Sequence, residues 1–95
     1  MKVRLTVPQQ GALECRRDGL EALTLEAWQG RYLVFYREQA DALLSELVEA
    51  SNAEDAQAER LRRIGDKDCA RFAARDSRAL GNIASSIVRA IRNES

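Results

Sequence analysis

Residues 69–91, with the sequence CARFAARDSRALGNIASSIVRAI, decide the fold of this chain. Their apolar side chains recur at steps of three and four, the period of an α-helix that buries one face. At 100° per residue, six of them lie within about 40° of Leu80. The apolar stripe consists of Cys69, Ala73, Leu80, Ile83, Ala84, Ile87, Val88 and Ile91. The pattern therefore predicts a long last helix.

Two shorter helical patterns precede this stretch. The first begins at Arg37 and carries Leu43, Leu44, Leu47 and Val48, with Asn52 as a stop or as the cap of the next segment. The second covers residues 53–64. Gly65 ends it as a C-terminal residue of left-handed geometry, and Asp66 or Asp68 caps the last helix.

The N-terminal third is predicted to be β-structure. Residues 2–7 alternate polar and apolar side chains, which indicates a half-buried strand. Residues 8–11, from Pro8 to Gly11, have the composition of a turn, and residues 13–16 alternate again as a weaker strand. The dipeptide Asp18-Gly19 favours a tight hairpin turn.

A second hairpin is predicted over residues 22–36. With Gln29 and Gly30 as its two-residue loop, the pairs Ala27–Tyr32, Leu25–Val34 and Leu23–Tyr36 share one apolar face. The other face carries Phe35, Leu33 and Trp28. The competing prediction is a helix over residues 19–29, because Leu20, Leu23 and Ala27 also fit helical spacing.

These patterns predict an α+β fold, with an N-terminal antiparallel sheet of three or four strands followed by two or three helices, the last one long. With 95 residues and no repeat, the chain has room for a single domain, β in residues 1–36 and helical in residues 37–95. The alternating N-terminus has no secretory leader pattern and no apolar run reaches membrane-spanning length, so we expect a cytoplasmic protein.

The residue types present argue against an enzyme. The chain contains no His, which is the commonest general base and metal ligand. Cys15 and Cys69 are too few and too far apart in sequence for a tetrahedral zinc site. A disulfide between them stays open, but two reduced, partly buried thiols are the simpler interpretation. We expect no catalytic residue, no metal site and no cofactor.

Charge is segregated along the chain although the net charge is zero. Residues 37–59 carry one basic and seven acidic side chains, and residues 60–95 carry nine basic and four acidic ones. On the last helix, polar side chains at alternating steps of four and three form a stripe opposite the apolar one. This arginine row consists of Arg71, Arg75, Arg78, Asn82, Ser85, Arg89 and Arg92.

The arginine row has three interpretations. It is a solvated helix face paired with the acidic helix, a surface for an acidic protein partner, or a nucleic-acid surface. Net neutrality counts against nucleic acid, whose binding domains are usually basic.

Two residues interrupt the apolar stripe of the last helix. Asp76 is predicted at an edge beside a local arginine, Arg63 or Arg75, or else at a contact used in association. Gly81 is predicted to mark a close crossing with another element.

Trp28 and Phe35 are the aromatic candidates for a partner surface, because helices covering one sheet face would leave theirs exposed. The alternative is that another helix or a second chain covers that side as core. Candidate partner-binding residues are Arg71, Arg75, Arg78, Arg89, Trp28 and Phe35.

In size and composition alone, the chain resembles the small accessory proteins of phages and mobile elements, CRISPR-system inhibitors among them. The resemblance implies a non-enzymatic inhibitor or adaptor that binds another protein. The alternative function is a nucleic-acid-binding accessory protein that uses the arginine row, and a homodimer through the spare sheet face or the long helix is the third hypothesis.

Overall fold

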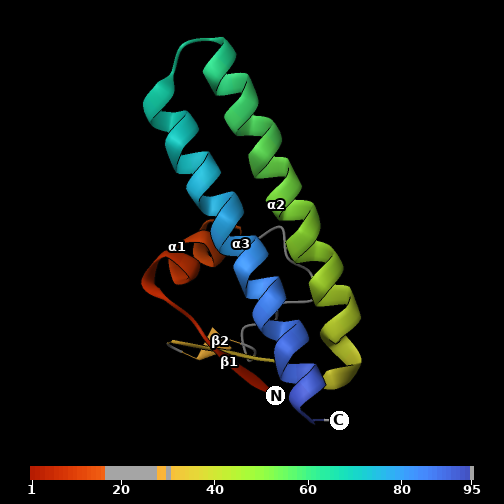
Figure 1. Cartoon of the computed structure of the whole chain (residues 1–95). Coiled ribbons are helices and arrows are strands. Elements are labelled where there is room, and N and C mark those ends of the chain that lie inside the picture. Colours follow the sequence, from red (N-terminus) through yellow and green to blue (C-terminus); the bar gives the residue numbers. More distant parts are fainter. Residues whose placement is uncertain (17–27, 30, 95) are drawn as a thin grey trace.

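Three helices and a small antiparallel sheet make up the protein (Figure 1). The computed structural model describes residues 1–16, 28–29 and 31–94. In chain order the elements are β1 (Lys2–Arg4), α1 (Val7–Arg16), β2 (Trp28–Gln29), β3 (Tyr32–Val34), the 3₁₀ turn η3 (Arg37–Gln39), α2 (Ala40–Arg63) and α3 (Lys67–Glu94). The fold is α+β with a long last helix, as predicted, but it is mostly helical, with less β-structure than predicted.

Helices α2 and α3 run antiparallel and form a hairpin along the molecule's 45 Å long axis (Figure 1). Gly65 turns the chain between them with a φ of 86°, where a side chain would be strained. The Asp66 carboxylate accepts a hydrogen bond from the Cys69 backbone N–H at 3.2 Å and so caps α3. Both residues act as the sequence predicted.

Asn52 does not end a helix, contrary to prediction. Helix α2 continues through it, because Ala50 and Ala58 on either side are buried and hold one continuous face against α3. Packing along the whole hairpin outweighs the weak helix-breaking tendency of a single exposed Asn.

The core lies at the end of the hairpin nearest the sheet. Leu43 and Leu47 of α2 meet Leu80, Ile83 and Ile87 of α3 there, all fully buried. Ala12 and Leu13 of α1 and Leu33 of β3 complete the same cluster. Burying each large aliphatic side chain contributes about 1.5–3 kcal/mol, so this end stabilises most of the fold.

The far end of the hairpin has a different interior. Its buried residues on both helices are alanines, Ala58 on α2 and Ala70 and Ala73 on α3. Small side chains let the two helices approach closely but bury little apolar area. Between these two ends of the hairpin, Ser51 of α2 contacts Ser77 of α3. The Ser51 hydroxyl lies 3.1 Å from the Ser77 hydroxyl and donates to the Ser77 carbonyl at 3.0 Å.

Residues 7–16 form a helix where a turn and a second strand were predicted. Thr6 and Gln9 form a capping box, because the Thr6 N–H donates to Gln9 Oε1 at 2.9 Å and the Gln9 N–H to Thr6 Oγ1 at 3.3 Å. Pro8 falls in the first turn, where a helix tolerates proline. The helix buries Leu13 and leaves Cys15 exposed, so the alternation of residues 13–16 was not a strand signal.

The sheet is smaller than predicted. Its strands are two or three residues long, in the order β1-β3-β2. Val3 of β1 pairs with Leu33 of β3, and the Met1 amine extends the ladder by donating to the Phe35 carbonyl at 2.7 Å. The predicted turn at Asp18-Gly19 and the predicted pairs of residues 22–27 lie outside the described residues.

The register and the buried face of the second hairpin also differ from prediction. Trp28 pairs with Leu33 and Gln29 with Tyr32, so Gly30 and Arg31, not Gln29 and Gly30, lie between the paired residues. Leu33 and Phe35 are buried, whereas Tyr36 is 73% exposed. The wholly apolar side chains take the core face, because tyrosine can keep its hydroxyl in water.

A charged junction holds α1 against the hairpin. Arg16, at the end of α1, forms an ion pair with Glu54 of α2. Asp76 of α3 is half-buried near both of them. Burial and the neighbouring Glu54 raise the pKa of Asp76, against the lowering effect of Arg75 and Arg16. Of the two arginines predicted beside Asp76, Arg75 acts on its carboxylate. The effect of Arg16, which comes from α1, was not predicted from the sequence.

Gly81 is not required by a close helix crossing. A Cβ atom at this position would lie 3.7 Å from Ser51 Oγ, an ordinary van der Waals distance. Because glycine inside a helix costs about 0.5–1 kcal/mol relative to alanine, Gly81→Ala should raise the free energy of unfolding by about that amount. Urea denaturation measures it, with Leu80→Ala as a control of opposite sign, expected to cost about 2–5 kcal/mol. A destabilised Gly81→Ala variant would contradict the packing described.

Asp76→Asn should stabilise the protein at neutral pH. Because the folded-state pKa of Asp76 is raised above its ordinary value of 3.8, ionising it costs folding free energy. That cost is absent well below the ordinary pKa, grows as the pH rises from the ordinary to the folded-state pKa, and is constant above the folded-state value. Urea denaturation of wild type and Asp76→Asn should therefore differ at neutral pH and converge below pH 3.8. Asp55→Asn, at an exposed position of α2, is the control. A gain equal at both pH values would contradict the argument.

Candidate partner-binding groove

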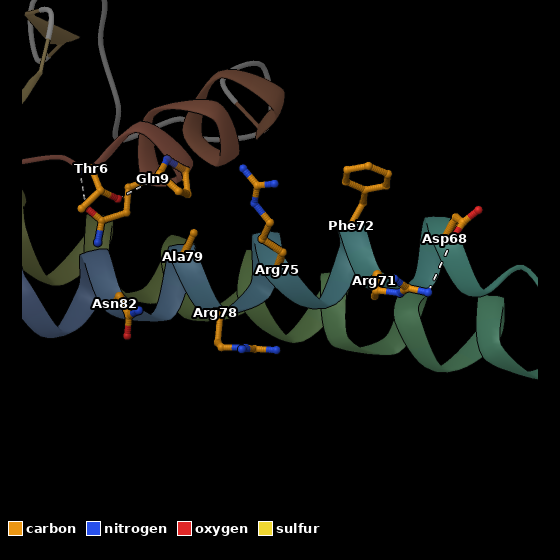
Figure 2. Close-up of a pocket in the computed structure, with 10 residues that line it drawn as sticks. Thr6, Gln9, Asp68, Arg71, Phe72, Arg75, Arg78, Ala79 and Asn82 are labelled. Carbon is orange, nitrogen blue, oxygen red and sulfur yellow. Dashed lines mark hydrogen bonds and ion pairs between the residues drawn. The ribbon is translucent and has the colours of Figure 1, made fainter.

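An open groove of about 860 Å³ lies between the start of α1 and the N-terminal half of α3. One wall comes from the capping box of α1 and the other from successive turns of α3 (Figure 2). We call it the α1–α3 groove. Its lining residues are Thr6, Pro8, Gln9, Asp68, Arg71, Phe72, Arg75, Arg78, Ala79 and Asn82.

Phe72 is the largest apolar residue that lines this groove. Its side chain is 63% exposed, an unusual state for a phenylalanine on a helix that buries so many other apolar side chains. Phe72, Arg75 and Ala79 project toward the α1 side of α3, and Arg71 and Arg78 project elsewhere on the same helix (Figure 2). An exposed aromatic ring with the Arg75 guanidinium on the same side of the helix can contact apolar and anionic groups together.

The arginines of this groove are largely available for a ligand. Arg71 lies 3.7 Å from Asp68, one turn earlier, and both side chains are more than four-fifths exposed. Such a pair contributes little, because solvent screens it. Arg75 and Arg78 form no ion pair with any other residue in the described ranges. The ion pair Arg16–Glu54 joins α1 to α2 and does not use Arg75 or Arg78.

The arginine row is exposed along its whole length, but it does not serve one surface. Arg71, Arg75, Arg78 and Asn82 line the α1–α3 groove. Ser85, Arg89 and Arg92 line a second groove, of about 570 Å³, between α2 and α3. We call the second one the α2–α3 groove. Of the predicted site residues, three arginines therefore come together and Arg89 lies apart from them.

The aromatic candidates do not join this site. Phe35 is only 3% exposed and belongs to the core, so it cannot serve as an exposed contact. Trp28 lies in β2, opposite Leu33, and its side chain is outside the described part of the structure. Phe35 lies on the same core face as Leu33. Its burial favours the alternative prediction, in which this side of the hairpin is covered as core.

Both cysteines are free and exposed, rather than partly buried as expected. The Asp66 carboxylate beside Cys69, through a hydrogen bond and its negative charge, raises the pKa of that thiol. A raised pKa disfavours the thiolate, which is the reactive form. Within the described ranges, no group of three acidic or cysteine side chains could hold a metal ion.

Sequence reasoning missed Phe72 and the α1 wall. A signal for Phe72 was available, because it lies about 80° around the helix from Leu80 and so falls between the apolar stripe and the arginine row. The Thr6-x-x-Gln9 spacing was likewise a readable sign of a helix start. The packing of the first helix beside Phe72, in contrast, had no signal in the sequence.

No described helix combines the length and the apolar character needed to cross a membrane. No protein-family model, curated protein or solved structure matches the chain.

Proposed function

We propose that this chain is a small, non-enzymatic protein-binding module that holds an acidic segment of another protein in the α1–α3 groove. The observation that carries the proposal is the exposed Phe72 ring beside Arg75, in a groove that Arg71 and Arg78 also line. The proposal retains the expectation, from size and composition, that the chain acts as an inhibitor or an adaptor by occupying a surface of its partner.

The chemistry of the groove supports a partner with both acidic and apolar side chains. Guanidinium groups bind carboxylates through paired hydrogen bonds. The positive end of the α1 helix dipole faces the same groove and favours negative charge further. The Phe72 ring would bury an apolar side chain of the partner, and interface energy typically concentrates in a few such residues.

Nucleic acid fits the groove less well. Phosphate binding usually rests on a basic domain, whereas this chain has no net charge. Helix α2, beside α3, carries six of the 15 acidic side chains and would repel a phosphate backbone that extended across the hairpin. An acidic protein segment confined to the α1–α3 groove avoids that repulsion.

The test is an unbiased peptide-display selection against the whole chain, followed by fluorescence anisotropy on the selected peptides. We expect selected sequences to place acidic residues around one apolar residue. Phe72→Ala and Arg75→Ala should each weaken binding by about 1–2 kcal/mol, which is roughly five- to thirtyfold. Both side chains are exposed, so circular dichroism should show an intact fold.

Arg60→Ala is the matched control, because Arg60 is an exposed arginine on α2 outside the groove. It should leave peptide binding unchanged. Duplex DNA of random sequence forms the second arm of the experiment. DNA binding whose constant falls with a log–log salt slope of about −0.9 per phosphate, and which Phe72→Ala and Arg75→Ala weaken, would overturn the proposal in favour of the nucleic-acid function.

A further inference from the structure

The α2–α3 groove is a second surface with a different character. Its apolar lining residues are Leu44 and Val48 of α2 and Ala84 and Val88 of α3. Val48 is 49% exposed, and Leu44 and Val88 are partly buried. A shallower hollow over Leu44, Val48 and Glu49 continues this apolar strip across α2.

The two edges of this groove carry opposite charges. On the α2 side, Asp41 lies about 60° around the helix from Leu44, and Glu49 borders the adjoining hollow; both are exposed. On the α3 side, Arg89 and Arg92 line the groove. Arg89 donates a hydrogen bond to the Ser86 hydroxyl at 3.4 Å and forms no ion pair with any residue in the described ranges. The groove is thus an apolar strip between an acidic and a basic edge.

We propose that a second copy of this chain docks on the α2–α3 groove and forms a two-fold symmetric four-helix bundle. The symmetry axis runs parallel to the helices. In this arrangement α2 of one copy lies over α3 of the other, and the two apolar strips bury each other.

The charges of the two helices favour this axis over one perpendicular to the helices. A two-fold axis perpendicular to the helices would stack α2 on α2 and α3 on α3, which sets like charges against each other. The parallel axis instead sets each acidic edge against a basic edge, and the two ion-pair rows are identical by symmetry. It also makes every helix antiparallel to both of its neighbours, an arrangement common in four-helix bundles.

The register of the hairpin brings specific charges to the same height. Ser51 contacts Ser77 and lies beside Gly81, which fixes the level of α2 relative to α3. The helices are antiparallel with equal rise, so ten residues back along α2 correspond to ten residues forward along α3. Asp41 therefore lies level with residues 87–91 of α3. Because the parallel axis preserves height, Asp41 of one copy faces Arg89 of the other.

A second copy fits this surface better than an unrelated partner. One surface that carries both signs of charge beside one apolar strip is complementary to itself. Two copies of a chain without net charge also approach without long-range repulsion.

Analytical ultracentrifugation of the whole chain under reducing conditions tests the proposal, and the reductant removes dimers made through the exposed Cys15 or Cys69. We expect a species of twice 10.7 kDa that dissociates on dilution. Val48→Glu should yield a folded monomer. Asp41→Arg and Arg89→Asp should each weaken the dimer about tenfold, and the double variant should restore it.

A wild-type monomer at a concentration of a hundred micromolar would overturn the proposal, as would a double charge swap without recovery. The result is separable from the proposed function. Phe72→Ala should lose peptide binding and keep the dimer mass, because Phe72 lines the α1–α3 groove only. Val48→Glu should do the reverse.

Discussion

The antiparallel contact between α2 and α3 is the constraint on which the rest of the structure depends. Leucine and isoleucine side chains fill it near the sheet, and alanine and serine side chains let the helices approach farther along. A helix in such a hairpin has one covered face and two flanks. On α3, one flank borders α1 and the other borders the outer side of α2. Both grooves result directly from this packing.

The same contact also determines where the segregated charges lie on the surface. An acidic stretch and a basic stretch that adjoin in sequence become two parallel edges when the chain turns back at Gly65. The surface of the hairpin therefore changes sign across its width. On the α1 side, Phe72 and Arg75 face an α1 wall of uncharged residues, and Asp68 is the one acidic residue among the described residues that line the groove. One polar row thus supports two surfaces with different chemistry.

The sequence predicted α3, the turn at Gly65 and the cap at Asp66 because each depends on local, periodic or single-residue signals. The sequence prediction was wrong for residues 7–16. Pro8 and Gly11 favour a turn, but the reciprocal hydrogen bonds between Thr6 and Gln9 favour a helix. A local cap together with the burial of Leu13 outweighed the preference of those two residues. The candidate site was half predicted, because Arg71, Arg75 and Arg78 could be read from spacing and Phe72 was not.

By itself, the sequence determined the long amphipathic helix, its row of arginines and the order of charge along the chain, since helical periodicity is a property of neighbouring residues. Only the tertiary structure decided that Phe35 is core, that Phe72 is a surface residue, and that the row divides between two grooves. Burial depends on which elements meet across the chain. Spacing along one helix fixes direction around its axis, but it does not fix the neighbour in that direction.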